Sequence, residues 1–504
     1  MKGIRSETMC HKRKITTDKI LLKHTYTKLP NVFYAKQLPD NTPFPRLKLF
    51  NEKLADELGL DSSFLEREAG VQFLSGNGIL ENSYPIAQAY AGHQFGYFTM
   101  LGDGRAVLLG EYEAKDGQRY DMQLKGSGRT PYSRGGDGKA ALGPMLREYI
   151  ISEGMHGLGI PTTRSLAVTM TGETIRREES LDGAVLTRIA KSHIRVGTFE
   201  YASGFLKKEN VKKLADYTIK RHFPTLEEVG GAYHNVYHGL LQKVVKQQAY
   251  LIAKWQLVGF IHGVMNTDNM AISGETIDYG PCAFMDRYNP DTVFSSIDLN
   301  GRYAYKNQPS IAMWNLAVLS ETLLPLLDDV PARAVAIADS EVTGFAKWYQ
   351  QYWLEGMGKK LGIESAKEED IEWIGQLLYI MEKYKADYTD TFFQFAKGTI
   401  KKTKLYQTKE FKEWYVLWEK RILAQNQIKD EVEKRMKQNN PVIIPRNYMV
   451  EEALEAAVKR RDDTMIKKLI EALQNPYDYE NIPLQYTKVP RERDSCMYQT
   501  YCGT

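Results

Sequence analysis

Cysteine is scarce in this chain: among 504 residues only Cys10, Cys282, Cys496 and Cys502 occur. Their spacings fit neither a disulfide framework nor a zinc site, so the sequence is typical of a reducing compartment and predicts a cytoplasmic protein. Cys496 and Cys502, which share a polar tail, are the one pair with a spacing that suits redox chemistry. Spacing alone is a weak signal, and an inert pair is the more ordinary interpretation.

Long apolar runs and an excess of charge of one sign are missing as well. No run of 18 or more apolar residues occurs, and the basic N-terminus lacks the apolar core of a signal peptide. The 67 basic and 63 acidic residues leave a formal net charge of +4, which argues against an extended nucleic-acid-binding surface. We therefore expect no membrane partner and no nucleic-acid partner, and we expect a monomer.

Internal repeats and low-complexity tracts are absent too, and the chain is too long for one compact core. Ala106–Tyr112 and Tyr120–Lys125 alternate around a turn and predict a hairpin. From about Val211 the apolar residues follow a helical spacing, and a long helix over 232–261 leads directly into His262. Further helices are predicted over 309–327, 333–357, 367–398, 409–438 and 449–473.

The order of strands before helices predicts an α+β protein with a bilobal, protein-kinase-like fold. The expected parts are a poorly ordered lead-in over 1–24, a strand-rich N-terminal nucleotide-binding lobe over 25–205, a large helical C-terminal lobe over 206–475 and a C-terminal tail over 476–504. The helical lobe would contain a metal-binding and catalytic loop at 262–286.

The stretch His262–Gly280 concentrates the acidic and amide side chains of that loop, with the sequence HGVMNTDNMAISGETIDYG. Two short apolar pieces around a Gly turn predict a tight hairpin that places Asn269 and Asp278 side by side. A carboxylate and an amide oxygen suit a hard cation such as Mg²⁺, with phosphates completing the shell. The sequence therefore predicts a metal site at Asn269 and Asp278.

The same stretch matches the pattern of protein kinases, H-R-D-L-x-x-x-N followed by D-F-G. His262 takes the place of the His, Asn269 that of the metal-binding Asn, and Asp278 that of the second Asp. The position of the kinase base falls on Val264, which cannot accept a proton. Asp268 is the nearest carboxylate that could take a proton from an attacking hydroxyl, although a loop-capping role is the alternative.

Candidate phosphate-binding residues precede this loop. Gly102, Gly104 and Arg105 lie in LGDGRA, where glycines let the backbone approach phosphate oxygens. Lys125 ends a predicted strand and Glu148 lies on the next helix, in the order that kinases use for a Lys–Glu ion pair. Alone, each of these features is more often an ordinary turn or a solvated side chain, and their shared order favours function.

A second Gly-rich loop, GSGRTPYSRGGDGK, contains Asp137 and Gly138 among basic residues that suit a phosphate tail. Arg188 and Arg195 bracket the run IAKSHI, and an Arg fork suits phosphate oxygens. For that Arg pair alone, a surface role and a functional role remain equally open.

Several long runs together resemble the selenoprotein O family (SelO/YdiU), over nearly the whole chain from about Tyr26. They are YAGHQFGYF, LGDGRA, QLKGSGRTPYSRGGDGKAAL, REYIISEGMHGLGIPTTRSL, TRIAKSHIRVGTFE, HGVMNTDNM with TIDYGPCAFMD, and PRNYMVEEAL. The resemblance implies a kinase-like fold that transfers AMP from ATP to Ser, Thr or Tyr hydroxyls of proteins, with Mg²⁺ or Mn²⁺. It implies nucleotide contacts from Gly102, Gly104, Arg105, Lys125, Asp137, Gly138, Arg188, Arg195 and Asp278, metal ligation by Asn269 and Asp278, a proton acceptor in Asp268, and a Glu148–Lys125 ion pair.

Two departures from the family pattern bear on redox chemistry. Cys502 stands where some members carry selenocysteine, and the segment NPDTVFSSIDLNGRY lacks the Cys that certain bacterial members have there. A regulatory disulfide between that segment and the tail is therefore not expected. Three other functions remain open: uridylyl transfer from UTP with Mn²⁺, phosphoryl transfer by a true kinase, and a non-catalytic ATP-binding scaffold.

Overall fold

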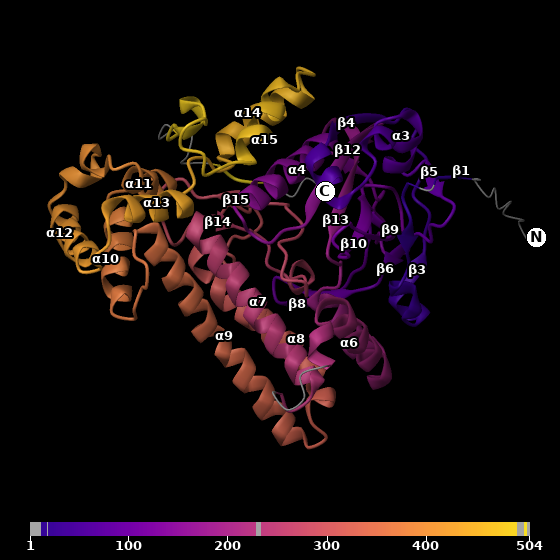
Figure 1. The fold of residues 1–504 in the computed structure, drawn as a ribbon. Coiled ribbons are helices and arrows are strands. Elements are labelled where there is room, and N and C mark those ends of the chain that lie inside the picture. The colour runs from indigo at the N-terminus through magenta and orange to yellow at the C-terminus, as the bar shows by residue number, and fades with distance from the viewer. Residues whose placement is uncertain (1–11, 18, 228–232, 491–497, 501–504) are drawn as a thin grey trace, which may run out of the picture. The chain divides into compact units, whose positions relative to one another are not determined.

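The computed structural model describes residues 12–17, 19–227, 233–490 and 498–500 (Figure 1). The chain is a mixed α and β protein with a sheet-containing part and a helical part. Its contacts divide it into two units. The first takes in the chain up to Ala89, Leu101–Met145 and Ser165–Lys191, and the second takes in Tyr90–Met100, Leu146–Arg164 and the chain from Ser192 onward. The predicted lobes, 25–205 and 206–475, stay a prediction about domains.

The first unit is built on one sheet with the strand order β3-β6-β9-β10-β13-β12-β4. Its central hairpin confirms the prediction from sequence, since β9 and β10 pair antiparallel with Lys125 opposite Ala106. The strands are β3 (Tyr34–Lys36), β4 (Arg46–Phe50), β6 (Ile86–Gln88), β9 (Ala106–Glu113), β10 (Arg119–Lys125), β12 (Arg164–Arg176) and β13 (Ser180–Ala190), with β2 (Leu22–Lys23) beside β9 and β11 (Ala140–Ala141) beside β13.

Three short helices, α1 (Glu52–Leu58), α2 (Ser62–Leu65) and α3 (Glu68–Leu74), pack their apolar residues against this sheet. Asn51 and Asp61 begin the first two, because each side chain accepts a hydrogen bond from a main-chain N–H of the first turn. The buried cluster combines side chains of these helices with alternate strand residues, including Leu54, Phe73, Val107, Leu109, Met122 and Leu124.

The prediction of a poorly ordered lead-in is wrong for the described residues of 12–24. Strand β1 (Arg13–Ile15) pairs parallel with β5 (Gly78–Leu80), and β2 pairs antiparallel with β9. Ile15 and Leu22 are buried in the core of the first unit. Strands of two or three residues leave too short a pattern for sequence reading, and burial of these apolar side chains is what orders them.

The second unit is largely helical. Its long helices α7 (Val236–Val258), α8 (Gln308–Leu327) and α9 (Pro331–Lys360) lie side by side (Figure 1). Asn235 caps α7 with its side chain, and Gly259 ends it in the left-handed conformation. The others are α4 (Leu142–Gly157, in this unit from Leu146), α5 (Val196–Phe205), α6 (Lys208–His222), α10 (Asp370–Lys383), α11 (Tyr388–Ala396), α12 (Lys409–Leu423), α13 (Lys429–Asn439), α14 (Asn447–Val458) and α15 (Thr464–Leu473), with the strand pairs β7 (Ala91–Gln94)–β8 (Tyr97–Met100) and β14 (Phe260–Ile261)–β15 (Ala283–Phe284).

Three stretches predicted as single helices, 367–398, 409–438 and 449–473, are each two helices. A non-glycine residue with positive φ lies at every break: Lys385, Asn426 and Arg461. The left-handed conformation stops an α-helix. Lys and Arg adopt it too rarely for the sequence to signal two of the breaks, and a single Asn is only a weak signal of the third.

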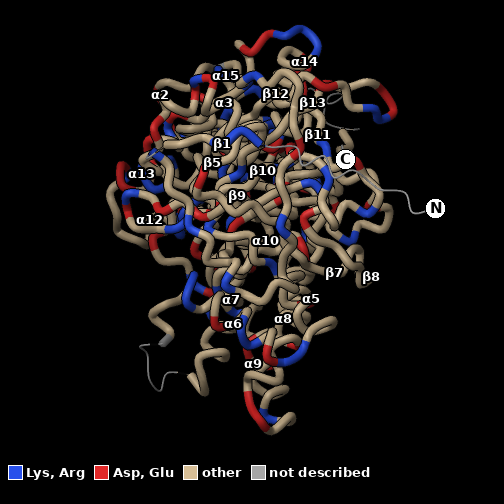
Figure 2. The backbone as a smooth tube through the Cα atoms, turned by 90° about the vertical axis from the view of Figure 1, so that its right-hand side faces the viewer, with Lys and Arg blue, Asp and Glu red and all other residues tan. Residues whose placement is uncertain are grey.

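Among the described residues, the helical segment Tyr305–Leu327, which contains α8, is the one whose length and composition would allow it to cross a membrane. Within its most apolar window, 56% of the residues are buried in the protein, and the helix packs against α7 and α9. Buried helices of water-soluble proteins share this composition, so the absence of a membrane partner stays a prediction. Basic and acidic residues are interspersed over the described backbone (Figure 2).

Candidate active site

The 262–286 loop of the second unit follows directly from α7 and β14. The predicted hairpin over 270–277 is wrong, because its two apolar pieces bond to other segments. Met270 accepts a hydrogen bond from the main-chain N–H of Val196 (2.9 Å), and the Thr276 N–H donates to Pro161 (2.9 Å). Only the turn between the pieces forms as expected, with Gly274 at φ +74°. Two chain segments that are distant in sequence therefore hold the loop in place.

His262 supports this loop from inside. Its Nε2 donates to the Ile277 carbonyl at 2.9 Å, and its ring stacks on Trp255 with 5.4 Å between the ring centres. Complete burial lowers the pKa of His262, so the imidazole is neutral. A neutral, fully packed ring suits a supporting role better than proton transfer.

Arg195 connects two acidic residues of the loop, Asp268 and Asp278. Its Nη1 donates to the Asp278 carboxylate at 2.7 Å and to the main-chain carbonyl of Asp268 at 2.8 Å. The guanidinium also lies over the ring of Tyr90, 4.7 Å from its centre. The structure thus brings together Arg195, Asp268 and Asp278, which sequence reasoning had proposed separately.

Asp278 holds a strained backbone conformation, with φ +61°. Aspartate tolerates this left-handed region better than most residues. The neighbouring candidate ligand, Asn269, donates from its amide nitrogen to the Val264 carbonyl at 2.9 Å. The Oδ1 of Asn269 is therefore the atom of that amide that can bind a cation.

Asp268 is buried, and burial raises the pKa of its carboxyl to about 7, against the lowering effect of Arg195. Its Oδ1 has no hydrogen-bond partner among the described residues. A buried oxygen without a partner is costly in a purely structural side chain and is typical of a group that meets a substrate.

The β7–β8 hairpin of the second unit packs directly on this carboxylate. A Cβ on Gly92 would lie 2.9 Å from Asp268 Oδ1, so a larger residue would displace the carboxylate. The His93 N–H donates to Thr267 Oγ1 (2.7 Å), and the Phe95 N–H donates to Asn266 Oδ1 (3.0 Å). Sequence reasoning had missed Gly92 and Asn266, although Gly92 stands in the quoted run YAGHQFGYF.

In the first unit, the LGDGRA turn is closed by the following Gly-rich loop. Gly102 has φ +131°, and a Cβ there would lie 2.4 Å from the ring of Tyr132. Asp103, buried between the two glycines, accepts from the Gln88 N–H at 3.0 Å, and the Arg105 carbonyl accepts from the Gly126 N–H at 2.7 Å. The glycines are therefore required by close packing as well as by any phosphate contact.

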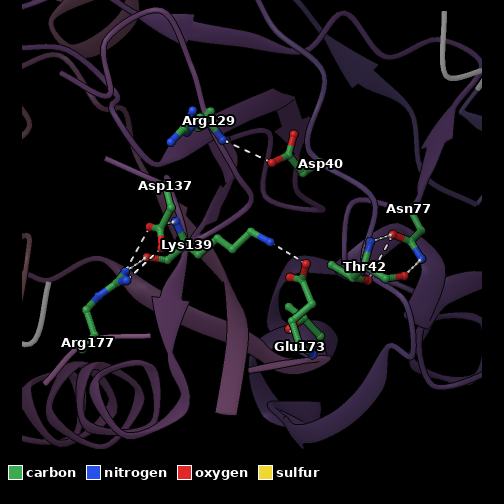
Figure 3. A network of polar contacts seen from close by, with 9 residues as sticks. Asp40, Thr42, Asn77, Arg129, Asp137, Lys139, Glu173 and Arg177 are labelled. Atoms are coloured by element: carbon green, nitrogen blue, oxygen red, sulfur yellow. Dashed lines mark hydrogen bonds and ion pairs between the residues drawn. The ribbon is translucent and has the colours of Figure 1, made fainter. Parts of the chain in front are cut away.

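The Gly-rich loop itself is tied to the sheet by ion pairs (Figure 3). Arg177 forms a two-pronged pair with Asp137 (2.8 and 3.0 Å), which holds the pKa of that carboxyl below its usual value. Lys139 pairs with Glu173, and Asp40 accepts from the Arg129 N–H at 3.4 Å. At Gly138 (φ +71°), a Cβ would lie 2.0 Å from the Gly128 carbonyl, so only glycine fits.

Lys125 and Arg188 lie on neighbouring strands, β10 and β13, and both are buried. Arg188 is paired in register with Gln123 and donates to its Oε1 at 3.4 Å. Glu148 is buried on α4 and belongs to the second unit. The Lys125–Glu148 ion pair, whose partners lie in different units, stays a prediction.

Comparison with known proteins decides the family. The sequence profile described as "Protein adenylyltransferase SelO" matches residues 19–474. This chain belongs to the SelO family. A relative named "Protein nucleotidyltransferase YdiU" from Clostridium botulinum is 58% identical over 496 residues, covering 98% of this chain and all of the relative. A relative of the same name from Lachnoclostridium phytofermentans is 57% identical over 485 residues, covering 96% of this chain and 99% of the relative. The expected family and the expected class of enzyme, a nucleotidyltransferase, are confirmed.

The site residues that the resemblance to the SelO family implies fall into two sets. Gly102, Gly104, Arg105, Lys125, Asp137, Gly138 and Arg188 lie in the first unit, and Glu148, Arg195, Asp268, Asn269 and Asp278 lie in the second. Their roles in nucleotide binding, metal binding and proton transfer remain predictions. Of the cysteines, only Cys282 lies within the described residues, where it is buried and forms no disulfide. The expectations for Cys496 and Cys502 concern residues outside the described part.

Proposed function

We propose that this chain transfers AMP from ATP to Ser, Thr or Tyr hydroxyls of proteins and releases pyrophosphate. The supporting observation is the buried Asp268 carboxylate, which lacks a partner on Oδ1 and lies on the same short loop as Asn269. The names of the relatives agree with nucleotidyl transfer. We also propose that the sheet-containing and helical parts form the two lobes of a kinase-like fold.

The chemical step needs few protein groups. The acceptor oxygen forms a bond to the α-phosphorus of ATP while the bond from that phosphorus to the pyrophosphate oxygen breaks. The proton of the attacking hydroxyl passes to Asp268, whose raised pKa suits a general base that operates near neutral pH. Val264, which stands at the position of the kinase base, has no proton-accepting group.

Arg195 prepares this step by fixing the loop. Its hydrogen bonds hold the Asp268 main chain and the Asp278 carboxylate in fixed positions, so that neither group has to reorganise during the reaction. In the first unit, Gly102, Gly104, Arg105, Lys125, Asp137, Gly138 and Arg188 are the proposed nucleotide contacts. The Lys125–Glu148 pair would orient that lysine toward the phosphates.

A divalent cation, Mg²⁺ or Mn²⁺, fits the donor set of the second unit. No group of three or more His, Cys, Asp or Glu side chains that could enclose a metal occurs among the described residues. Asn269 Oδ1 and the Asp278 carboxylate offer two hard oxygen ligands, which is the number that Mg²⁺ commonly takes from a protein when phosphates and water supply the rest. When bound, such a cation neutralises phosphate charge.

ATP labelled separately at the α- and γ-phosphates tests the proposal. The full-length protein is incubated with each label and with candidate protein acceptors, and incorporated label is measured after denaturation. We expect label from the α position only, together with an added mass of one AMP on the acceptor. Label from the γ position alone would identify a kinase. Label transferred from the α position of UTP in preference to ATP would identify a uridylyltransferase. ATP binding without any transfer of label would identify a scaffold.

Asp278→Ala provides the matched negative control, because it removes a proposed metal ligand. Activity that survives this change would contradict the site assignment. Lys347→Ala, on the exposed side of α9, should retain full labelling.

A further inference from the structure

The second unit contains a cavity of about 360 Å³ among the C-terminal ends of α7 and α9. Leu257 and Val258, in the last turn of α7, line it, and the chain continues from there to His262. Its charged lining residues are three lysines and one glutamate, and tyrosines add hydroxyl groups. These residues are Lys254, Glu355, Lys359 and Lys360, with Tyr250, Tyr352 and Tyr477.

Lys360 distinguishes this cavity from an ordinary surface hollow. The side chain comes from the last turn of α9, and only 3% of the residue is exposed. Its Nζ lies 4.2 Å from the centre of the Phe392 ring and 5.5 Å from that of Tyr388. No carboxylate among the described residues forms an ion pair with Lys360, and Glu355 also lies outside ion-pair distance of it.

A buried ammonium without an anionic partner is unfavourable, and cation–π contacts offset only part of the lost hydration. Burial accordingly lowers the pKa of Lys360 to about 7. The 262–286 loop does not use this lysine. A ligand anion in the cavity would supply the missing partner, and the exposed Lys359 and half-buried Lys254 would add positive charge around it.

We propose that this cavity binds a small anion through a phosphate or carboxylate group that pairs with Lys360. The lysine head, the tyrosine hydroxyls and the volume suit a compact ligand with one such group rather than a whole nucleotide. Glu355 at the same wall opposes ligands with additional negative charge. The proposal is independent of nucleotidyl transfer, since none of its residues belongs to the proposed nucleotide or metal site.

The groups that bear on the charge of Lys360 are few. The charged groups of the cavity wall besides Lys360 are Lys254 on α7 and Glu355 and Lys359 on α9, Tyr477 lines the same cavity, and the Tyr388 ring on α11 lies against the ammonium. Tyrosine hydroxyls stay neutral at pH 7, so a bound anion should favour the charged form of Lys360. Anion binding near that pH should therefore raise the pKa of Lys360 and take up a proton.

The test is nuclear magnetic resonance of the full chain with its lysines ¹³C-dimethylated by reductive alkylation. Lys360→Arg, which keeps the charge, identifies the Lys360 signal by its disappearance. Inorganic phosphate and, separately, acetate are titrated at constant ionic strength made up with chloride. We expect a saturable shift of the Lys360 signal and a rise of its pKa by about one unit or more, while the signal of Lys347 stays in place.

A response to phosphate alone would identify a phosphate ligand, and a response to acetate alone would identify a carboxylate ligand. A Lys360 signal that responds to neither anion would overturn the proposal and leave Lys360 as a structural cation packed on Phe392. Because the measurement is made on the wild-type chain, it does not depend on the folding of any neutral variant. Anion binding at the nucleotide site would shift other signals and is distinguished in the same spectra.

Discussion

Arg195 and Asp278 form an ion pair at 2.7 Å, and the same nitrogen of Arg195 donates to the Asp268 carbonyl at 2.8 Å. One side chain therefore sets the distance between the proposed base and the proposed metal ligand. The arrangement is stiff because the guanidinium is 4% exposed and rests on Tyr90.

Replacement of this arginine should affect turnover more than folding. A lysine at position 195 keeps the charge but cannot reproduce the planar geometry that reaches both acceptors. We expect Arg195→Lys to lower the kcat of AMP transfer by about 100-fold, measured with α-labelled ATP. Arg333→Lys, which changes an exposed side chain that pairs with Asp328, is the control and should keep its activity. A wild-type kcat in the Arg195→Lys enzyme would contradict the proposed positioning role of Arg195.

Asp268→Asn tests the proposed base without changing its shape. The amide cannot take the proton from the attacking hydroxyl, so kcat should fall by about 10²- to 10⁴-fold. The dissociation constant of a non-hydrolysable ATP analogue, measured by calorimetry, should change little. Lost nucleotide binding with an intact fold would instead assign Asp268 to the binding site.

Gly138 and Gly117 form a matched pair in the first unit, because both have positive φ but only Gly138 is crowded. Gly117→Ala should cost about 1 kcal/mol of unfolding free energy from backbone strain. Gly138→Ala must also displace the Gly128 carbonyl, and we expect a loss larger by about 1–3 kcal/mol. Urea unfolding of both variants measures the difference, and equal losses would show that the Gly-rich loop relaxes freely.

Lys360 should make stability depend on pH. The unfolded chain holds this proton up to the ordinary lysine pKa of 10.5, whereas the folded chain holds it only up to about 7. Between these values the unfolded state binds more protons, so wild-type stability should rise with pH relative to Lys360→Met, by at most about 1.4 kcal/mol per pH unit. Chemical unfolding at pH 7 to 9 checks this, with Lys347→Met as the control. A constant difference between wild type and Lys360→Met would mean that the buried ammonium stays charged.

Arg446 should be essential for stability. It pairs with Asp286 (2.6 Å) and Asp387 (2.8 Å), and all three side chains are buried. Arg446→Met would leave two carboxylates without their cation, at a cost of about 3–5 kcal/mol. Lys383→Met, which breaks an exposed pair with Glu410, should cost less than about 1 kcal/mol. The unfolding midpoints of the two variants measure these losses of stability. Similar losses would contradict a stabilising role for the ion pairs of Arg446 with Asp286 and Asp387.

The sequence predicted the parts that local pattern determines. Alternation of apolar and polar residues predicted β9 and β10, and helical spacing of apolar residues predicted α7 to α9. The order of the motifs identified Asp268, Asn269 and Asp278 as candidate site residues.

Sequence pattern did not reveal features that depend on distant partners. The apolar pieces at 270–277 alternate like a hairpin, yet their hydrogen bonds go to residues near 161 and 195. Gly92 is ordinary as a residue type, and its role comes only from the Asp268 carboxylate packed against it. The cavity at Lys360 is formed by the ends of α7 and α9, whose proximity no local pattern encodes.

The non-local hydrogen bonds of the 262–286 loop have a kinetic consequence. Thr276 bonds to Pro161, 115 residues earlier in the sequence, and Asp268 is reached by Arg195 across 73 residues. Contacts of such long range form slowly, because the loop-closure entropy must be overcome before they stabilise the chain. During refolding from denaturant, helix α7 should regain its amide-exchange protection before this loop does, and enzymatic activity should return only with the later event.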